Sequence, residues 1–164
     1  SYDCYCVEIG QGINSTYQAH ASVTTLLGSS TNTGGVTGPI FFDAVKVDRL
    51  ERLWGTFKSG VNSSTTAAAF QLAVWKTTFD TSLNLADASS VIYIAPSNSN
   101  PATVLAQSYL NAVASGAASS RQQLLLLSDP NIQDQITAVP EPASLLALGV
   151  VSALVVAGRR RKVV

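Results

Sequence analysis

An uncharged apolar stretch near the C-terminus, Ala143–Gly158, constrains the fold most strongly, because four cations follow it at once. Its only clearly polar residues are Ser144 and Ser152. As a helix it would extend roughly 24 Å, a little short of a ~30 Å hydrocarbon core. A core helix seldom ends in four consecutive cations, so we favour a membrane-associated tail over a buried C-terminal core helix. Basic residues after such a span stay cytoplasmic, which places the preceding body on the far side of the membrane.

The residues on either side of this stretch complete a three-part pattern, with a Val-Pro-Glu-Pro segment before it and an arginine cluster after it. This pattern resembles the PEP-CTERM sorting signal of exported bacterial envelope proteins. The resemblance implies that an exosortase, a membrane sorting enzyme, processes the chain at or near the Pro-Glu-Pro site. The tail, residues 139–164, would then be a temporary anchor, and residues 1–138 a working domain sent to the cell surface or the biofilm matrix. The signal residues are Val139, Pro140, Glu141, Pro142, Arg159, Arg160 and Arg161.

The composition indicates a folded domain whose charge excludes a nucleic-acid partner. Charged residues make up 12% of the chain and apolar residues 46%, which is not the composition of a disordered segment. Four of the ten basic residues lie at 159–162, which leaves six basic residues against ten acidic ones. A body of that sign offers no positive surface to nucleic acid. Because the chain opens at Ser1 without methionine, we expect that an export signal preceded it.

Three helices are indicated by apolar spacing and by capping residues. The first is expected from about Ala44 to Phe57, where Leu50, Leu53, Trp54 and Phe57 recur at helical spacing, and Gly60 is a plausible stop. A second helix is expected from Ser64 or Thr65, which are good N-caps, to Phe79. A third is expected from Asn100 as N-cap and Pro101 at the first helical position, with Val104, Leu105, Tyr109 and Val113 on its apolar face and an end near Gly116.

Strands are expected at both ends of the body. The fold class is therefore α+β, a single domain with N- and C-terminal strands around a central group of helices, plus the C-terminal hydrophobic helix. The segments expected to form strands are 3–9, 17–27 (one strand or a pair of strands), 91–95, 122–127 and 132–137.

Two short segments, one around a cysteine near the N-terminus and one around a glutamine in the second helix, are informative as a pair. Taken singly, each is typical of core packing. Together they resemble the thioester domains of bacterial surface adhesins, in which an aromatic-Cys-apolar strand precedes a helix with apolar-Gln-x-x-apolar-Trp. The matching residues are Tyr5, Cys6, Val7, Phe70, Gln71, Val74 and Trp75.

The resemblance implies a thioester between Cys6 and Gln71, with Tyr5, Phe70 and Trp75 shielding it from water. A thiolate is the nucleophile and the carboxamide is the acceptor. The activated acyl group would capture an amine or hydroxyl on an exopolysaccharide or protein target. Each molecule would act once, so we expect no enzyme activity. The alternative function is a non-covalent structural or carbohydrate-associated matrix protein with an inactive Cys–Gln pair.

Other residues leave weaker possibilities open. Cys4 could compete with Cys6 for the acyl group, whereas Lys76 lies about 140° around the helix from Gln71 and is poorly placed to attack the bond. His20 is the only histidine and no nucleophile elbow occurs, so a hydrolase is disfavoured. The loop Asp80–Asp87 has calcium-ligand types without EF-hand spacing. Three Cys and His side chains cannot complete a closed zinc site, and we expect neither metal nor cofactor.

Overall fold

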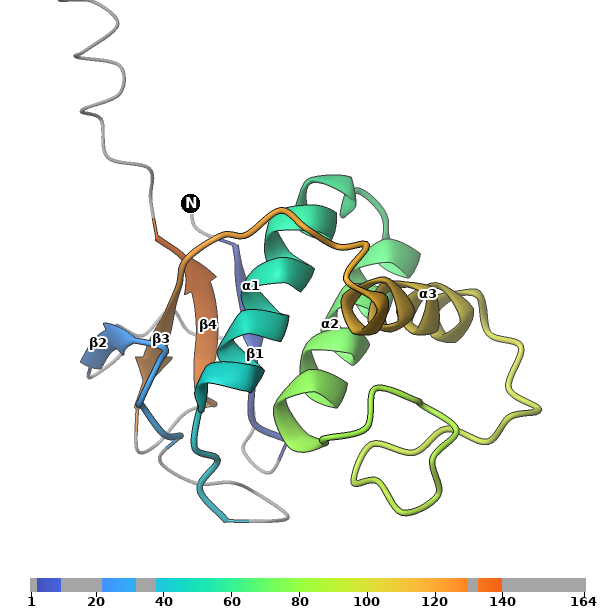
Figure 1. The fold of residues 1–164 in the computed structure, drawn as a ribbon, viewed down its shortest axis with the longest axis horizontal. Coiled ribbons are helices and arrows are strands. Elements are labelled where there is room, and N and C mark those ends of the chain that lie inside the picture. Colours follow the sequence, from blue (N-terminus) through green and yellow to red (C-terminus); the bar gives the residue numbers. More distant parts are fainter. Residues whose placement is uncertain (1–2, 10–21, 32–37, 130–132, 140–164) are drawn as a thin grey trace, which may run out of the picture.

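The computed structural model describes residues 3–9, 22–31, 38–129 and 133–139, and these form an α+β fold (Figure 1). The elements described are β1 (Cys4–Cys6), β2 (Ser22–Thr25), α1 (Ala44–Phe57), the short 3-10 helix η1 (Lys58–Gly60), α2 (Ser64–Phe79), α3 (Pro101–Ser115), β3 (Leu124–Ser128) and β4 (Gln135–Ala138).

The strands form one antiparallel sheet in the order β1-β4-β3-β2. The first strand of the chain therefore pairs with the last, so that Cys6 lies opposite Gln135 and Tyr5 lies opposite Ile136. The helices lie on one side of this sheet, with α1 and α2 next to it and α3 farther out (Figure 1). The segment before the sorting tail is thus built into the same sheet as the predicted cysteine site.

Alternation along the strands divides the sheet into two faces. Tyr5, Ile136 and Leu126 are in register, and Tyr5 contacts residues of both α1 and α2, so this row faces the helices. The neighbouring row, which contains Cys6 and Gln135, points to the opposite face. The core lies between the first row and the helices, and its largest fully buried side chains include Phe42, Phe70, Leu50, Leu53, Leu110, Leu124, Leu126 and Ile136.

The three predicted helices are present, and their ends follow from the capping signals in the sequence. The carboxylate of Asp43 accepts from the backbone nitrogen of Lys46 at 2.9 Å and begins α1. The N-cap of α2 is Ser63, one residue before the first predicted candidate, and it forms a capping box with Thr66. Gly116 ends α3 in the left-handed conformation, with φ of 83°.

The strands are shorter than predicted, and one predicted strand is wrong. Residues 91–95 form a bend at 91–92 followed by irregular chain, because the backbone nitrogens of Val91 and Ile92 donate to the carboxylate of Asp80 at 2.7 and 2.9 Å instead of joining a sheet. On the predicted apolar face of α3, Tyr109 and Val113 are buried as expected, together with Ala106 and Leu110, whereas Val104 is 60% exposed. The predicted C-terminal hydrophobic helix lies outside the described residues.

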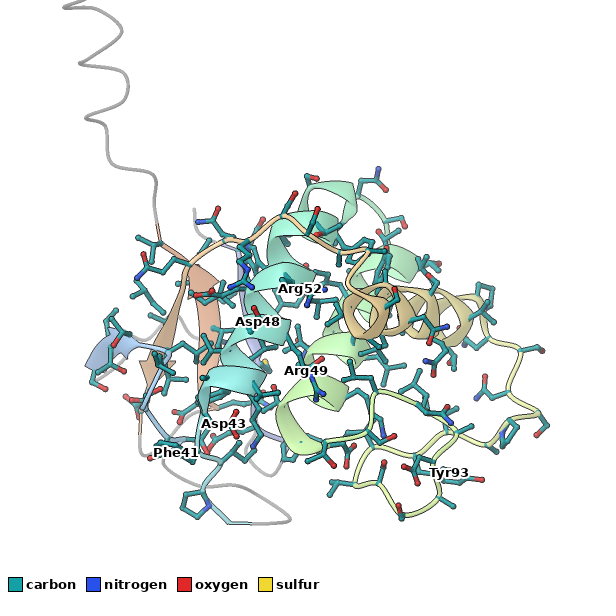
Figure 2. All side chains as sticks on the ribbon, viewed as in Figure 1. Phe41, Asp43, Asp48, Arg49, Arg52 and Tyr93 are labelled. Atoms are coloured by element: carbon teal, nitrogen blue, oxygen red, sulfur yellow. The ribbon has the colours of Figure 1, made fainter. Side chains whose placement is uncertain are left out.

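Arg52 ties α1 to the end of α3. Its guanidinium donates to the carbonyl oxygens of Ala118 at 2.6 Å and Val113 at 3.0 Å, and it also pairs with Asp48 one turn earlier. Asp48 and Arg52 lie along α1 in Figure 2. The Val113 carbonyl also accepts from the backbone nitrogen of Gly116 at 3.3 Å, so the arginine adds a second donor at the end of α3, where the last carbonyls lack partners within the helix.

Gly55 is expected to be intolerant of a side chain, although it lies within α1. A Cβ atom there would lie 2.7 Å from the backbone of both Ser120 and Arg121, which cross the helix at this point. Relief requires backbone movement, so Gly55→Ala should lower the free energy of unfolding by about 1–3 kcal/mol despite the better helix propensity of alanine. Urea denaturation of this variant measures the change. Gly60→Ala is the control, because nothing lies within 4 Å of its Cβ position. Equal stability of Gly55→Ala and the parent would contradict the close approach.

Candidate functional site

Gln71 connects α2 to the edge of the sheet at Cys6. Its side-chain Nε2 donates to the backbone oxygen of Cys6 at 2.8 Å, and the backbone nitrogen of Cys6 donates to its Oε1 at 3.1 Å. Because β1 is an edge strand among the described residues, these peptide groups of Cys6 face no described strand, and the carboxamide pairs with them in its place. The fold therefore brings together two residues that are 65 positions apart in the sequence.

The sulfur of Cys6 lies beside a second carboxamide, that of Gln135. The two residues face each other across β1 and β4, and Nε2 of Gln135 lies 4.0 Å from Sγ of Cys6. The carboxamide of Gln71, by contrast, is bonded to the peptide groups of Cys6. Gln71 must therefore leave those groups and turn toward the sulfur before a bond between them can form.

An aromatic cluster holds β1 against the two helices behind the cysteine. The Tyr5 ring makes edge contacts with Phe70 at 4.7 Å and with Trp54 at 5.4 Å between centroids, and Trp54 and Phe70 are 5.6 Å apart. Phe70 is fully buried. Tyr5 and Phe70, two of the predicted shielding residues, thus lie on the helix side of the strand. Trp54, whose spacing predicts only a place on a helix face, completes the cluster.

Trp75, the third predicted shielding residue, follows Gln71 by one helical turn. Residues four apart share a helix face, so its ring lies on the same face of α2 as Gln71. Its indole nitrogen is buried and has no hydrogen-bond acceptor within the described part of the chain. Buried donors are normally paired, so the described residues leave one donor unsatisfied a single turn from the glutamine.

The two thiols differ in exposure but not in the direction of their pKa shifts. Cys4 is exposed and Cys6 is only 8% exposed, and neither forms a disulfide. Burial raises the pKa of the Cys6 thiol, and the hydrogen bond from Gln135 opposes this in part. Partial burial, followed by the negative charge of Asp3, raises the pKa of the Cys4 thiol. Both thiols are therefore largely protonated at neutral pH.

Lys76 and Asp80 form a buried ion pair within α2 and the turn that follows. Nζ of Lys76 lies 3.1 Å from Oδ2 of Asp80 and donates to the carbonyl of Ile92 at 3.0 Å. The lysine side chain is inaccessible to solvent, so it is engaged away from Gln71. Both oxygens of Asp80 accept hydrogen bonds from the backbone, which leaves this carboxylate committed to the loop instead of a calcium ion. The described residues contain no group of three acidic, histidine or cysteine side chains that could hold a metal.

Only the first residue of the predicted sorting signal lies in the described part of the structure. The backbone nitrogen of Val139 donates to the carbonyl of Gln123 at 2.9 Å, and its own carbonyl accepts from Gln122 at 3.2 Å. Within the described ranges no helix is long and apolar enough to cross a membrane. The remaining sites named from the sequence lie outside these ranges: His20, Pro140, Glu141, Pro142, Arg159, Arg160 and Arg161.

Comparison with known proteins identifies the sorting motif of the tail. The family model for the PEP-CTERM protein-sorting motif matches residues 138–162. No curated protein and no solved structure matches the chain. The chain thus carries a PEP-CTERM protein-sorting motif, which implies export, transient membrane anchoring by the C-terminal tail, and an exosortase as the sorting partner.

Proposed function

We propose that the protein is an exported cell-surface or biofilm-matrix protein that attaches covalently to its target through a thioester between Cys6 and Gln71. The target is an amine or hydroxyl group on a surface protein or an exopolysaccharide. The observation that carries the proposal is the pair of hydrogen bonds between the Gln71 carboxamide and the peptide groups of Cys6. The sorting motif supports the location, because it directs the body out of the cell, where the proposed targets lie.

The chemistry balances without a cofactor. The sulfur of Cys6 attacks the carboxamide carbon of Gln71, a carbon–sulfur bond forms, and the carbon–nitrogen bond breaks. Ammonia leaves with the thiol proton. An incoming amine then attacks the same carbonyl carbon, forms an amide and returns the sulfur of Cys6 as a thiol. A hydroxyl group would give an ester in the same way.

A carboxamide is a poor electrophile, so the fold must hold it close to the sulfur. Positioning of this kind supplies a large part of the barrier lowering in intramolecular reactions. Here β1 and α2 are joined by the Tyr5–Phe70 ring contact and by the hydrogen bonds of Gln71, one residue farther along each element. These neighbouring contacts limit how far the glutamine can move away from the cysteine.

One observation favours the second candidate, a non-covalent matrix protein on the same scaffold. The carboxamide of Gln71 already satisfies both free peptide groups of Cys6, which is a sufficient structural role for a glutamine at a sheet edge. Mass spectrometry separates the two candidates, because a thioester lacks one molecule of ammonia relative to the sequence mass.

Thioester formation is expected to accelerate with pH. Burial raises the pKa of the Cys6 thiol, so the thiolate fraction is small at neutral pH and grows about tenfold per pH unit below that pKa. When unfolded chain is refolded between about pH 6 and 8, ammonia loss followed by intact mass should rise by up to this factor per unit. The hydrolysed product, in which the carboxamide has become a carboxylate, is counted with the thioester. A rate independent of pH would argue against attack by the Cys6 thiolate.

Removal of residues 143–164 is expected to leave a folded body that is no longer retained in the cell envelope. The last described parts of the fold are β4 and the backbone hydrogen bonds of Val139. No described contact therefore depends on the deleted segment. Cell fractionation measures the location, and circular dichroism of the truncated protein measures the fold. Replacement of the arginines at 159–161 by serine tests the basic segment separately. Loss of the fold on truncation would mean that the tail belongs to the core.

A further inference from the structure

We infer that Gln135 is the hydrogen-bond donor to the reacting sulfur of Cys6, and that it stabilises the thiolate both when it attacks and when it leaves. This inference rests on the proposed function for its purpose, but the contact itself does not depend on thioester formation. No feature of the two motifs that suggested a Cys–Gln pair includes this residue.

The geometry comes from the strand register. Cys6 and Gln135 are direct partners across β1 and β4, so their side chains leave the same face of the sheet. Side chains opposite each other in an antiparallel pair are close neighbours, and here Nε2 of Gln135 lies 4.0 Å from Sγ of Cys6. An amide N–H can donate to sulfur but cannot remove its proton, so Gln135 favours the thiolate without acting as a base.

Because Cys6 is buried, a hydrogen-bond donor to its sulfur has a large effect on the stability of the thiolate. The cysteine is 8% exposed, so water solvates the thiolate poorly, and burial raises the pKa of the thiol. Two buried acidic residues adjoin this part of the sheet, Glu8 two positions after Cys6 and Asp134 next to Gln135, and neither carries a positive charge that could stabilise a thiolate. Lys76 is engaged with Asp80, and Lys58 is paired with Asp3 beyond Cys4. A hydrogen bond from a neutral amide is therefore the local means of stabilising negative charge on this sulfur.

The contacts of Gln71 and Gln135 give the two glutamines different roles in the proposed reaction. Gln71 touches the peptide groups of Cys6 and carries the carbonyl carbon that is attacked in the proposed reaction. Gln135 touches the sulfur and lies on the opposite strand, where it can stay in place while Gln71 turns. When an amine opens the thioester, the same N–H group meets the departing thiolate.

The test measures the ionisation of Cys6 in a chain that cannot form the thioester. In a Cys4→Ser, Gln71→Ala background, the pH midpoint of iodoacetamide alkylation reports the pKa of the Cys6 thiol alone. Gln135→Leu keeps a similar volume without the donor and should raise this midpoint by roughly one pH unit. Gln135→Glu, which has no donor when ionised and adds a negative charge, should raise it further. Thr137→Val, at the pair next along the same face, is the matched control and should leave it unchanged.

The same substitution has a kinetic consequence in the otherwise unmodified chain. Below the pKa, a rise of one unit reduces the thiolate fraction about tenfold while making each thiolate more nucleophilic, so ammonia loss should slow about threefold in Gln135→Leu. An unchanged or lowered alkylation midpoint in both Gln135 variants would overturn the inference, whether or not the thioester exists. A shifted midpoint in a chain that never loses ammonia would uphold the Gln135 contact and overturn only the proposed function. Loss of ammonia that continues in Gln71→Ala and stops in Gln135→Leu would make Gln135 the acyl donor, which contradicts both assignments.

Discussion

Asp80→Ala is expected to destabilise the protein by about 3–5 kcal/mol, the largest effect on folding among the changes considered. The substitution leaves the Lys76 ammonium buried, with 0% of its side chain exposed, and without a counter-ion. It also removes the acceptor for the backbone nitrogens of Val91 and Ile92, which lie 2.7 and 2.9 Å from the carboxylate. The loop after α2 therefore loses its attachment at the same time as the helix loses its ion pair. Urea denaturation, followed by the circular dichroism of the helices, measures the change.

The reciprocal and control variants make this prediction specific to burial. Lys76→Met should cost less than Asp80→Ala, because the carboxylate keeps its two backbone donors. Asp3→Asn breaks the Lys58–Asp3 pair, in which the aspartate side chain is 72% exposed, and should cost only about 0–1 kcal/mol. If Asp80→Ala were as mild as Asp3→Asn, the pair would not be buried as described.

Cys6→Ala is expected to abolish both the loss of ammonia and the covalent capture of a small amine, while Cys4→Ala leaves both intact. The reason is that Gln71 lies next to Cys6 and not next to Cys4. The carboxamide of Gln71 is bonded to the peptide groups of Cys6, and the strand carries Cys4 two residues farther along the sheet edge. Incorporation of a fluorescent amine, scored on denaturing gels, measures capture. The opposite pattern would assign the thioester to Cys4.

A matched glutamine variant distinguishes chemistry from folding in this experiment. Gln71→Glu keeps an oxygen that can accept from the backbone nitrogen of Cys6, but a carboxylate is not displaced by a thiolate. It should therefore retain the fold and lose capture. Leu72→Ala changes the next, half-buried residue of α2 and should keep capture. Loss of capture in every variant of α2 would indicate a general disturbance of the helix instead of a role for Gln71.

The helices could be predicted closely because their ends are encoded locally. Asp43, Asn100 with Pro101, and Gly116 each act within a few residues, and the observed bounds of α1 and α3 match those expected. Spacing also predicted the buried face of α1, where Leu50, Leu53 and Trp54 are at most 5% exposed. These signals need no knowledge of the rest of the chain.

The strands were predicted less well because their partners lie far away in the sequence. Residues 91–95 have the apolar composition of a strand, but the carboxylate of Asp80, 11 and 12 positions earlier, binds their backbone. Such a contact has no local signature. Of the candidate site, the motif pair pointed to Cys6 and Gln71, whereas the place of Gln135 beside the sulfur depends on a register that joins the two ends of the body.

The central claim is tested most directly by the intact mass of the freshly purified wild-type protein, measured before and after incubation with methylamine. A thioester between Cys6 and Gln71 predicts a chain lighter than its sequence mass by one ammonia. After methylamine the mass should exceed the sequence mass by one CH₂ group, with the added group located on Gln71 by peptide mapping and the Cys6 thiol free. A chain at full sequence mass that methylamine leaves unchanged would contradict covalent attachment and leave Gln71 as a hydrogen-bonding cap on the edge of β1.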